Sequence, residues 1–197
     1  MREMIKMVVV LTILSFFSGG VLAYLRNSTQ ERIDNQVLEF VKGPAVRTIF
    51  EGAGNNPIAD RFTLKDGDVE RKFFVAIFDG EPRGVAFETS GKGYGGDVGL
   101  MVGIDVKDDK VMGVGVTTHG ETPGMGAKAK SDPSFVSQFK GLGLKEPFKV
   151  TADGGSISAI SGATITSRAV SAAATNAEDI YQKLKPQIDD KLKGFKK

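Results

Sequence analysis

The sequence Asp-Val-Gly-Leu-Met-Val-Gly-Ile-Asp-Val-Lys-Asp-Asp-Lys-Val-Met-Gly-Val-Gly-Val-Thr-Thr (residues 97–118) holds two apolar runs joined by a short charged turn. Side chains alternate between the two faces of an extended strand, so the runs 97–106 and 111–118 each place their apolar residues on one face. The apolar positions are Leu100, Val102, Ile104 and Val106 before the turn, and Val114 and Val116 after it. Strands joined by so short a turn pair antiparallel. The stretch therefore predicts an antiparallel sheet and not alternating β–α–β units.

More strands are predicted before this hairpin. Residues 72–78 are rich in β-forming side chains, residues 79–82 (Asp-Gly-Glu-Pro) are typical of a turn, and residues 83–89 alternate again. Residues 51–68 are rich in Gly, Asn and Asp and are predicted to be a loop. The glycine-rich run 91–96 lies between two strands with no helix opening after it, so it is predicted to be a hairpin loop and not a phosphate-binding loop.

Helical periodicity flanks the predicted sheet. Residues 28–50 carry apolar side chains at helical spacing and predict a helix, an interruption at Pro44 and a second short helix. Residues 133–140 begin another short helix. Residues 166–185 predict a long amphipathic helix that Pro186 kinks or ends, with a short Lys-rich helix after it. The fold class is therefore α+β, an antiparallel sheet flanked by helices.

The first 27 residues have the composition of a membrane anchor. Between Lys6 and Arg26 lie 19 uncharged residues, which as a helix span about 28 Å, close to the hydrocarbon thickness of a bilayer. A cleaved signal peptide is the main alternative, although the apolar run exceeds a usual signal core. We predict a membrane anchor over 1–27 and a domain over 28–197. Lys and Arg are nearly balanced across the span, but a short basic tail before a single span usually stays cytoplasmic, which predicts an exported domain.

The composition excludes several classes of function. A net charge of +2 without a basic stripe argues against a nucleic-acid partner. The chain has no cysteine and a single histidine, His119, which excludes thiolate zinc sites, cysteine-ligated iron–sulfur clusters and histidine-rich metal sites. No metal site is predicted. Redox chemistry in this chain requires an organic cofactor.

The run Ser161-Gly162-Ala163-Thr164-Ile165-Thr166 stands directly before the predicted long helix. Its small residues allow a bulky group to approach the backbone, and its hydroxyls supply donors and candidate nucleophiles. A phosphate placed here meets unpaired N–H groups and the positive end of the helix dipole. Ordinary helix N-caps use the same residue types, however, and on these residues alone the ordinary cap is the simpler interpretation.

Three motifs together resemble a known family, the FMN-binding subunits of the Rnf ferredoxin:NAD oxidoreductase (its G subunit) and of the sodium-pumping NADH:quinone reductase (its C subunit). The family motif [Ser/Thr]-Gly-Ala-Thr matches residues 161–164. The loop Glu-Thr-Pro-Gly-Leu-Gly matches residues 121–126, with Met125 in place of leucine, a volume-conserving exchange. The third match is the Gly-Tyr-Gly-Gly run at 93–96, which leads into residues 100–105. The motifs run in the family's order behind a single anchor.

The resemblance implies that a flavin transferase esterifies the phosphate of FMN onto Thr164. Thr166 is the alternative attachment point, and the register of the motif favours Thr164. The resemblance also places the loop from Glu121 beside the flavin and Tyr94 against a ring face. A loop-stabilising role for Glu121 remains equally open, and His119 is expected to be a strand-end residue rather than a proton donor. The candidate cofactor-binding residues are Thr164, Ser161, Gly162, Ala163, Thr166, Glu121, Thr122, Gly124 and Tyr94.

One residue departs from the family pattern. Family members often carry Asp three residues before the [Ser/Thr], where this chain has Ser158. The nearest upstream acid is Asp153. If that Asp assists the transferase, then recognition is weakened here or Asp153 takes its place.

The function that the resemblance implies is electron relay through covalent FMN in a membrane-bound, ion-translocating Rnf-type complex. Its expected partners are the other membrane subunits, the flavin transferase and the lipid bilayer. The expected location is the cytoplasmic (inner) membrane, with the domain on the outer, periplasmic side. Two alternatives remain: the C subunit of a sodium-translocating NADH:quinone reductase, and a non-redox anchored binding module in which residues 161–164 are only a helix cap. The short chain and the Gly-Tyr-Gly-Gly run favour the Rnf type.

Overall fold

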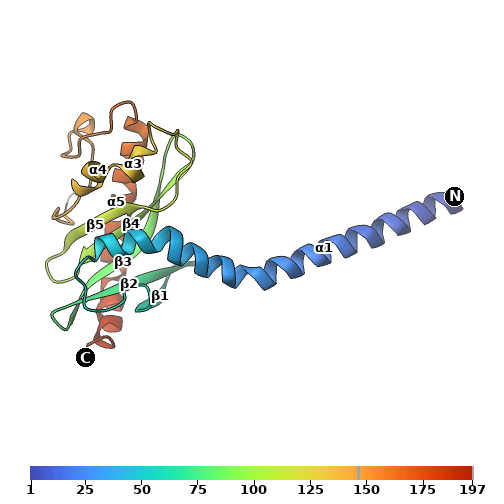
Figure 1. Ribbon diagram of the computed structural model, residues 1–197, viewed down its shortest axis with the longest axis horizontal. Coiled ribbons are helices and arrows are strands. Elements are labelled where there is room, and N and C mark those ends of the chain that lie inside the picture. The colour runs from blue at the N-terminus through green and yellow to red at the C-terminus, as the bar shows by residue number, and fades with distance from the viewer. Residues whose placement is uncertain (146, 197) are drawn as a thin grey trace. The chain divides into compact units, whose positions relative to one another are not determined.

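One sheet of five antiparallel strands organises the domain in the computed structural model, which describes residues 1–145 and 147–196 (Figure 1). Lys197, the last residue of the predicted domain, lies outside the described residues. The strands follow one another in the order β1-β2-β3-β4-β5, so each pairs with its neighbour in sequence. This confirms the predicted antiparallel α+β architecture. The strands are β1 Arg61–Asp66, β2 Val69–Phe78, β3 Glu81–Lys92, β4 Asp97–Asp105 and β5 Lys110–Val116.

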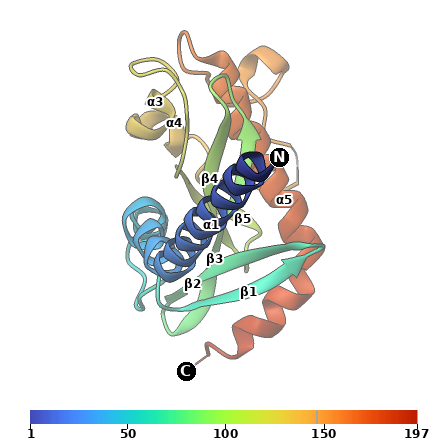
Figure 2. The same ribbon diagram turned by 90° about the vertical axis from the view of Figure 1, so that its right-hand side faces the viewer.

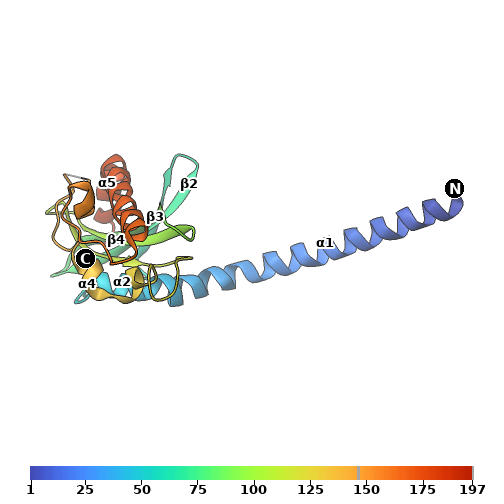
Figure 3. The same cartoon turned by 90° about the horizontal axis from the view of Figure 1, so that it is seen from above.

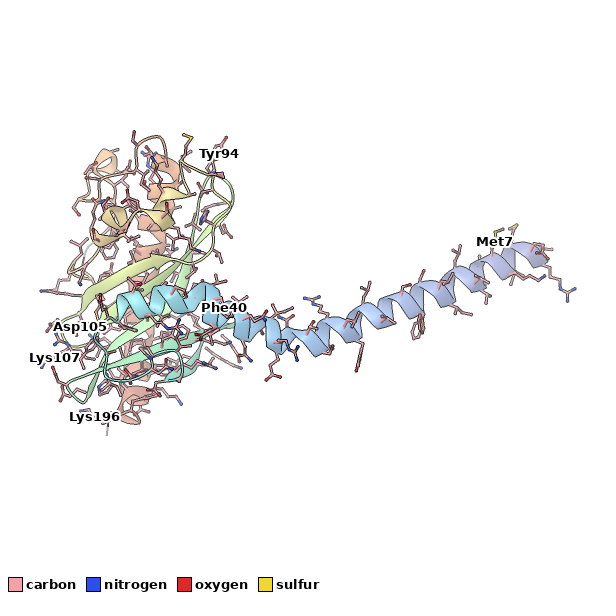
Figure 4. The ribbon with its side chains drawn as sticks, in the orientation of Figure 1. Met7, Phe40, Tyr94, Asp105, Lys107 and Lys196 are labelled. Carbon is pink, nitrogen blue, oxygen red and sulfur yellow. The ribbon has the colours of Figure 1, made fainter. Side chains whose placement is uncertain are left out.

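Tight turns set the register of this meander. Between β2 and β3, Asp79 and Gly80 have φ values of 53° and 81°, the left-handed pair that matches the twist of a two-residue hairpin. Between β3 and β4, Lys92 pairs with Asp97, so the glycine-rich run is a hairpin loop as predicted. Tyr94 at this loop and Lys107 at the β4–β5 turn lie at opposite ends of the sheet (Figure 4).

The prediction of a loop over residues 51–68 is wrong in its second half, because residues 61–66 form the edge strand β1. Phe62 stacks on Phe73 of β2 with ring centroids 5.4 Å apart, and Leu64 is buried. The surrounding Gly, Asn, Pro and Asp residues obscure this short alternation in the sequence. A tertiary contact, and not local propensity, holds the strand in place.

The long helix α5 (Thr164–Lys193) covers one face of the sheet and packs mainly on β3 and β4 (Figures 2 and 3). Its buried stripe is rich in alanine, which allows a close approach, and the Thr89 hydroxyl on β3 donates to the Ala173 carbonyl at 2.8 Å. The predicted end at Pro186 is wrong, because Pro186 lies inside the helix. Ile188 and Leu192 continue the buried stripe beyond it, so packing holds the last turns in helical form.

The opposite face of the sheet receives helix α2 (Gly43–Ile49) (Figure 3). A Cβ built on Gly103 of β4 collides with the Ile49 side chain, and one built on Gly84 of β3 lies 2.6 Å from the Phe50 ring. Glycine on the strands therefore makes room for this helix. Because both faces are covered, β4 is buried along nearly its whole length.

The N-terminal helical stretch contains one π-helical segment between two α-helices. The helix α1 (Arg2–Gln36) is followed by a π-helical segment η1 (Val37–Lys42) and then by α2. The predicted interruption at Pro44 is wrong in position, because Pro44 lies in the first turn of α2, where the missing N–H of proline is tolerated. Among the described residues, one helical stretch, Arg2–Ile49, includes a part long and apolar enough to cross a membrane.

The chain separates into two compact units, Met1–Glu39 and Phe40–Lys197. The boundary predicted after residue 27 stays a prediction. In the first unit, no residue of α1 is buried.

Short helices connect β5 to α5. They are α3 (Lys128–Ser131), which the sequence did not predict, α4 (Pro133–Ser137) and the 3₁₀ turn η2 (Thr151–Asp153). The predicted helix over 133–140 is confirmed in its first part. The Phe135 and Phe139 rings pack edge to face with centroids 5.9 Å apart, which closes the end of the core.

The contact between β3 and α5 is tested by Gly91→Ala. A Cβ at Gly91 collides with the Ala169 carbonyl, and this oxygen belongs to helix backbone that cannot step aside. We expect the free energy of unfolding to fall by about 2 kcal/mol or more, measured by urea denaturation of the full chain in detergent with circular dichroism. Gly113→Ala on β5 is the matched control, since its Cβ lies 3.5 Å or more from its neighbours and should change stability far less. Equal effects of the two substitutions contradict this packing.

Candidate functional site

A cavity of about 490 Å³ opens where three segments meet at one end of the domain. They are the β3–β4 hairpin loop, the loop that begins at Glu121, and the first turn of α5. The volume lies within the range of small-molecule and cofactor sites. Seven of the nine predicted cofactor-binding residues line it. The lining residues are Tyr94, Glu121, Thr122, Met125, Gly126, Gly162, Ala163, Thr164, Ile165 and Thr166.

The helix start in the cavity wall is uncapped. Thr164 is the first residue of α5, and the N-cap position is Ala163, which has no side chain able to cap. The first N–H groups of any α-helix have no carbonyl partner within the helix. No side-chain hydrogen bond caps them here. These donors and the positive end of a 30-residue helix therefore favour an anion at the cavity.

The two candidate threonines differ in accessibility. Thr164 is half-buried and lines the cavity. Thr166 is only 2% exposed, and its hydroxyl donates a hydrogen bond to the Glu121 carboxylate. Gly126 closes over this pair, because a Cβ there lies 2.6 Å from Thr166 Oγ1. Thr166 also borders the cavity, but its side chain is buried and its hydroxyl is bonded to Glu121, so the half-buried Thr164 is the more accessible of the two.

Glu121 is the buried carboxylate of the site, at 6% exposure. One of its oxygens accepts the Gly95 N–H at 2.9 Å, and the other accepts the Thr166 hydroxyl. Burial acts to raise the pKa of Glu121. The hydrogen bonds from Thr166, Gly95 and Tyr94 and the nearby His119 outweigh burial, so the pKa lies below the ordinary 4.5 and the carboxylate stays ionised near neutral pH.

The cavity has an apolar rim of Tyr94, Met125 and Ile165, which are 75%, 48% and 49% exposed. Each comes from a different one of the three segments. Beyond residue 39, the described chain exposes five large apolar side chains, these three together with Phe40 and Val69. Three of the five gather at this one opening, which marks it as a surface made for an apolar ligand group.

Two predicted site residues lie nearby but outside the cavity lining. Ser161 is exposed in the turn before α5, and Gly124 supplies a turn with φ of 75°. His119 lies after β5 and does not line the cavity either, although its Nδ1 is buried without a hydrogen-bond partner among the described residues.

Ser158 stands where family members often carry Asp, and the nearest upstream acid, Asp153, has a charged partner on α5. Asp153 and Arg168 form a bidentate ion pair, in which two guanidinium nitrogens donate to the two carboxylate oxygens at 2.7 Å each. Arg168 follows Thr164 by four residues and therefore lies one helical turn away on the same side of α5. The backbone N–H of Ser158 donates to the Gln138 side chain at 2.7 Å. Asp153 is thus paired with a residue one helical turn beyond Thr164.

Four residues of the site were not among the predicted cofactor-binding residues. Met125 and Gly126 were known only as members of a motif, and Ile165 was not considered. An apolar residue just outside the buried stripe of an amphipathic helix was the available signal for Ile165. No sequence pattern indicates the role of the Gly95 N–H, because its contact with Glu121 joins segments 26 residues apart.

Comparison with known proteins assigns this arrangement to a family. Residues 93–179 match the FMN-binding domain family, and this range includes every cavity residue. Over 167 residues the chain is 34% identical to the G subunit of the ion-translocating oxidoreductase complex of Cereibacter sphaeroides, covering 81% of this chain and 76% of that one. Over 190 residues it is 32% identical to the protein of the same name from Vibrio cholerae, covering 91% and 90%. The chain belongs to the family of these G subunits.

Solved structures share the fold of this G-subunit family member. The C subunit of the Na⁺-translocating NADH-quinone reductase from Parabacteroides distasonis superposes with a TM-score of 0.58 at 24% identity, covering 81% of this chain and 96% of that one. NqrC from Shewanella oneidensis gives a TM-score of 0.53 at 26% identity, covering 70% and 72%. These likenesses confirm the α+β architecture.

The ionised state of Glu121 predicts a pH dependence. Its pKa is lower in the folded than in the unfolded chain, so the stability that it contributes is present above pH 4.5 and is lost as the pH falls through the lower folded value. We therefore expect the difference in unfolding free energy between wild type and Glu121→Gln to stay constant above pH 4.5 and to shrink as the pH falls below it, measured by urea denaturation.

The control has the opposite sign. Burial and then Asp179 raise the pKa of Glu178, so its ionisation costs stability as the pH rises. The unfolding free energy of wild type should therefore rise relative to that of Glu178→Gln as the pH falls. The same trend for both variants is inconsistent with this electrostatic account.

Proposed function

We propose that the chain relays electrons through FMN held in this cavity, as one component of a membrane-bound, ion-translocating oxidoreductase complex of the Rnf type. The observation that carries the proposal is that three segments far apart in sequence meet at one cavity. Each of them holds one of the family's motifs, and all lie within the range that matches the FMN-binding domain. The G-subunit relatives support the Rnf type over the alternatives.

The chemistry of the cavity suits the parts of FMN. The uncapped start of α5 suits the phosphate. The apolar rim suits the flat ring system. Tyr94 would lie against a ring face, and Glu121 and Thr122, which line the cavity, would be the candidate partners for polar ring edges. When bound, FMN supplies one-electron and two-electron redox chemistry. The protein residues bind it, orient it and limit the access of water.

We propose Thr164 as the point of covalent attachment, through a phosphoester made by a flavin transferase. Its support is the greater accessibility of Thr164, the burial of Thr166, and the helix N–H groups next to the phosphate. The Arg168–Asp153 pair one turn along is a candidate contact for the transferase in place of the acid absent at Ser158. Covalent attachment suits a carrier on the outer face of a membrane, where free FMN is scarce.

We also propose that α1 anchors the chain in the cytoplasmic membrane with the domain on the outer side. The length and apolar composition of this helix support an anchor. The proposed partners are the other membrane subunits of the complex. The C subunit of a sodium-translocating NADH:quinone reductase shares the fold, but the relatives at 32–34% identity over most of the chain are G subunits.

Covalent attachment is tested by coexpression with a flavin transferase and denaturing gel electrophoresis. Flavin fluorescence should survive denaturation in wild type and disappear in Thr164→Val, which removes only the hydroxyl. Thr166→Val is the matched control two residues away and should keep the signal. A colourless wild type beside an active transferase contradicts the flavin function. If the signal is lost in Thr166→Val but kept in Thr164→Val, FMN is attached to Thr166 and the proposed attachment site is wrong.

Orientation is tested with a single introduced thiol, since the chain has no cysteine. Asp68→Cys lies in the exposed β1–β2 turn and should react with a membrane-impermeant maleimide in intact spheroplasts. Arg2→Cys, in the tail before the span, should react only after lysis. The reverse pattern would put the domain in the cytoplasm.

A further inference from the structure

The Glu121 carboxylate joins all three segments of the cavity. It belongs to the second segment, accepts the Gly95 N–H from the hairpin loop and accepts the Thr166 hydroxyl from α5. Gly95 and Thr166 are separated from it by 26 and 45 residues. A hydrogen bond to a charged group contributes more than one between neutral groups. This one side chain therefore contributes strongly to the shape of the cavity.

The backbone is built closely around this carboxylate. A Cβ at Gly93 collides with Glu121 Oε1, and one at Gly126 lies 2.7 Å from Glu121 Oε2. Glycine at both positions leaves a slot of the size of the carboxylate. A slot of this kind fixes the position of the two oxygens as well as the three segments.

The charge in the slot is held without a strong counter-charge. Among the described residues, no Lys or Arg forms an ion pair with Glu121; neutral donors hold it, and His119 is the charge partner that lowers its pKa. Water and salt screen a buried charge less than an exposed one, so its electrostatic effect on a neighbouring group is larger. The wall of the cavity thus carries one fixed negative charge.

We propose that Glu121 is a positioning residue that holds the cavity in shape and lowers the reduction potential of the flavin bound there. The inference rests on the proposed function. Each electron that the flavin accepts brings one negative charge, until a proton from solvent neutralises it. A fixed negative charge in the wall opposes that uptake, so the oxidised form is favoured. If Glu121 acted only through its hydrogen bonds, loss of its charge would leave the potential unchanged.

The test compares the midpoint potentials of flavin-loaded full chains in detergent, titrated with dithionite at pH 7. Glu121→Gln removes the charge and keeps both the side-chain shape and an oxygen that accepts the Gly95 N–H. We expect it to favour the reduced flavin about tenfold, a rise of about 30 mV for a two-electron couple. Thr166→Val removes one hydrogen bond and keeps the charge, so we expect a change of less than about threefold. Equal shifts in both variants, or no shift in Glu121→Gln, overturn the inference.

A second variant keeps the test valid if Glu121→Gln folds or loads poorly. Glu121→Asp retains the charge but draws the carboxylate back by one methylene, which weakens both hydrogen bonds. Amide hydrogen exchange at Gly95 should then rise about tenfold in the flavin-free chain, while the potential of the loaded chain stays within about threefold of wild type. A rise in potential as large as that expected for Glu121→Gln, or unchanged exchange at Gly95, overturns the inference.

The two proposals fail in different ways. A wild-type chain that carries no flavin beside an active transferase overturns the proposed function, and the inference with it. A loaded wild type whose potential does not respond to loss of the charge overturns the inference alone.

Discussion

Close packing of α5 against the sheet is the constraint on which the rest of the structure depends. The alanine-rich stripe of the helix allows its backbone to approach β3. The approach is so close that position 91 has no room for a side chain beneath the Ala169 carbonyl, and glycine occupies it. The hydrogen bond from Thr89 to the Ala173 carbonyl fixes how far the helix can slide. With its register set in this way, the first turn of α5 is brought to the end of the sheet where the β3–β4 hairpin loop lies (Figure 1).

The site follows from that placement. The helix start brings an uncapped positive end, Thr164 and the apolar Ile165 to the cavity, and the hairpin loop and the loop from Glu121 complete its walls. Glu121 then ties the walls together from within. Anion-binding, apolar and acceptor groups are therefore gathered from three segments around one cavity, an arrangement that suits an amphipathic cofactor such as FMN.

Alternating apolar residues predicted four of the five strands, because β2 to β5 combine clear alternation with tight turns. Strand β1 escaped prediction, since Phe62 and Leu64 gain their partners only through β2 and the helix face. The interruption predicted at Pro44 was wrong, because Pro44 lies in the first turn of α2, where a helix tolerates proline. The end predicted at Pro186 was wrong because packing continues α5 beyond it, while the alternative of a kink there stays a prediction. For the site, seven of the nine predicted cofactor-binding residues line the cavity, but the Glu121–Thr166 bond joins positions 45 apart that no local pattern connects.

The central claim is that this cavity holds FMN on one particular hydroxyl, and tandem mass spectrometry of a single peptide tests it most directly. Trypsin releases residues 150–168, which contain both Thr164 and Thr166, and no other cleavage site lies between its ends. In chain coexpressed with a flavin transferase, the fragment ions should carry the FMN phosphoester on Thr164 with Thr166 unmodified. A peptide with the flavin on Thr166, or with no flavin from a chain that nonetheless fluoresces, contradicts the account.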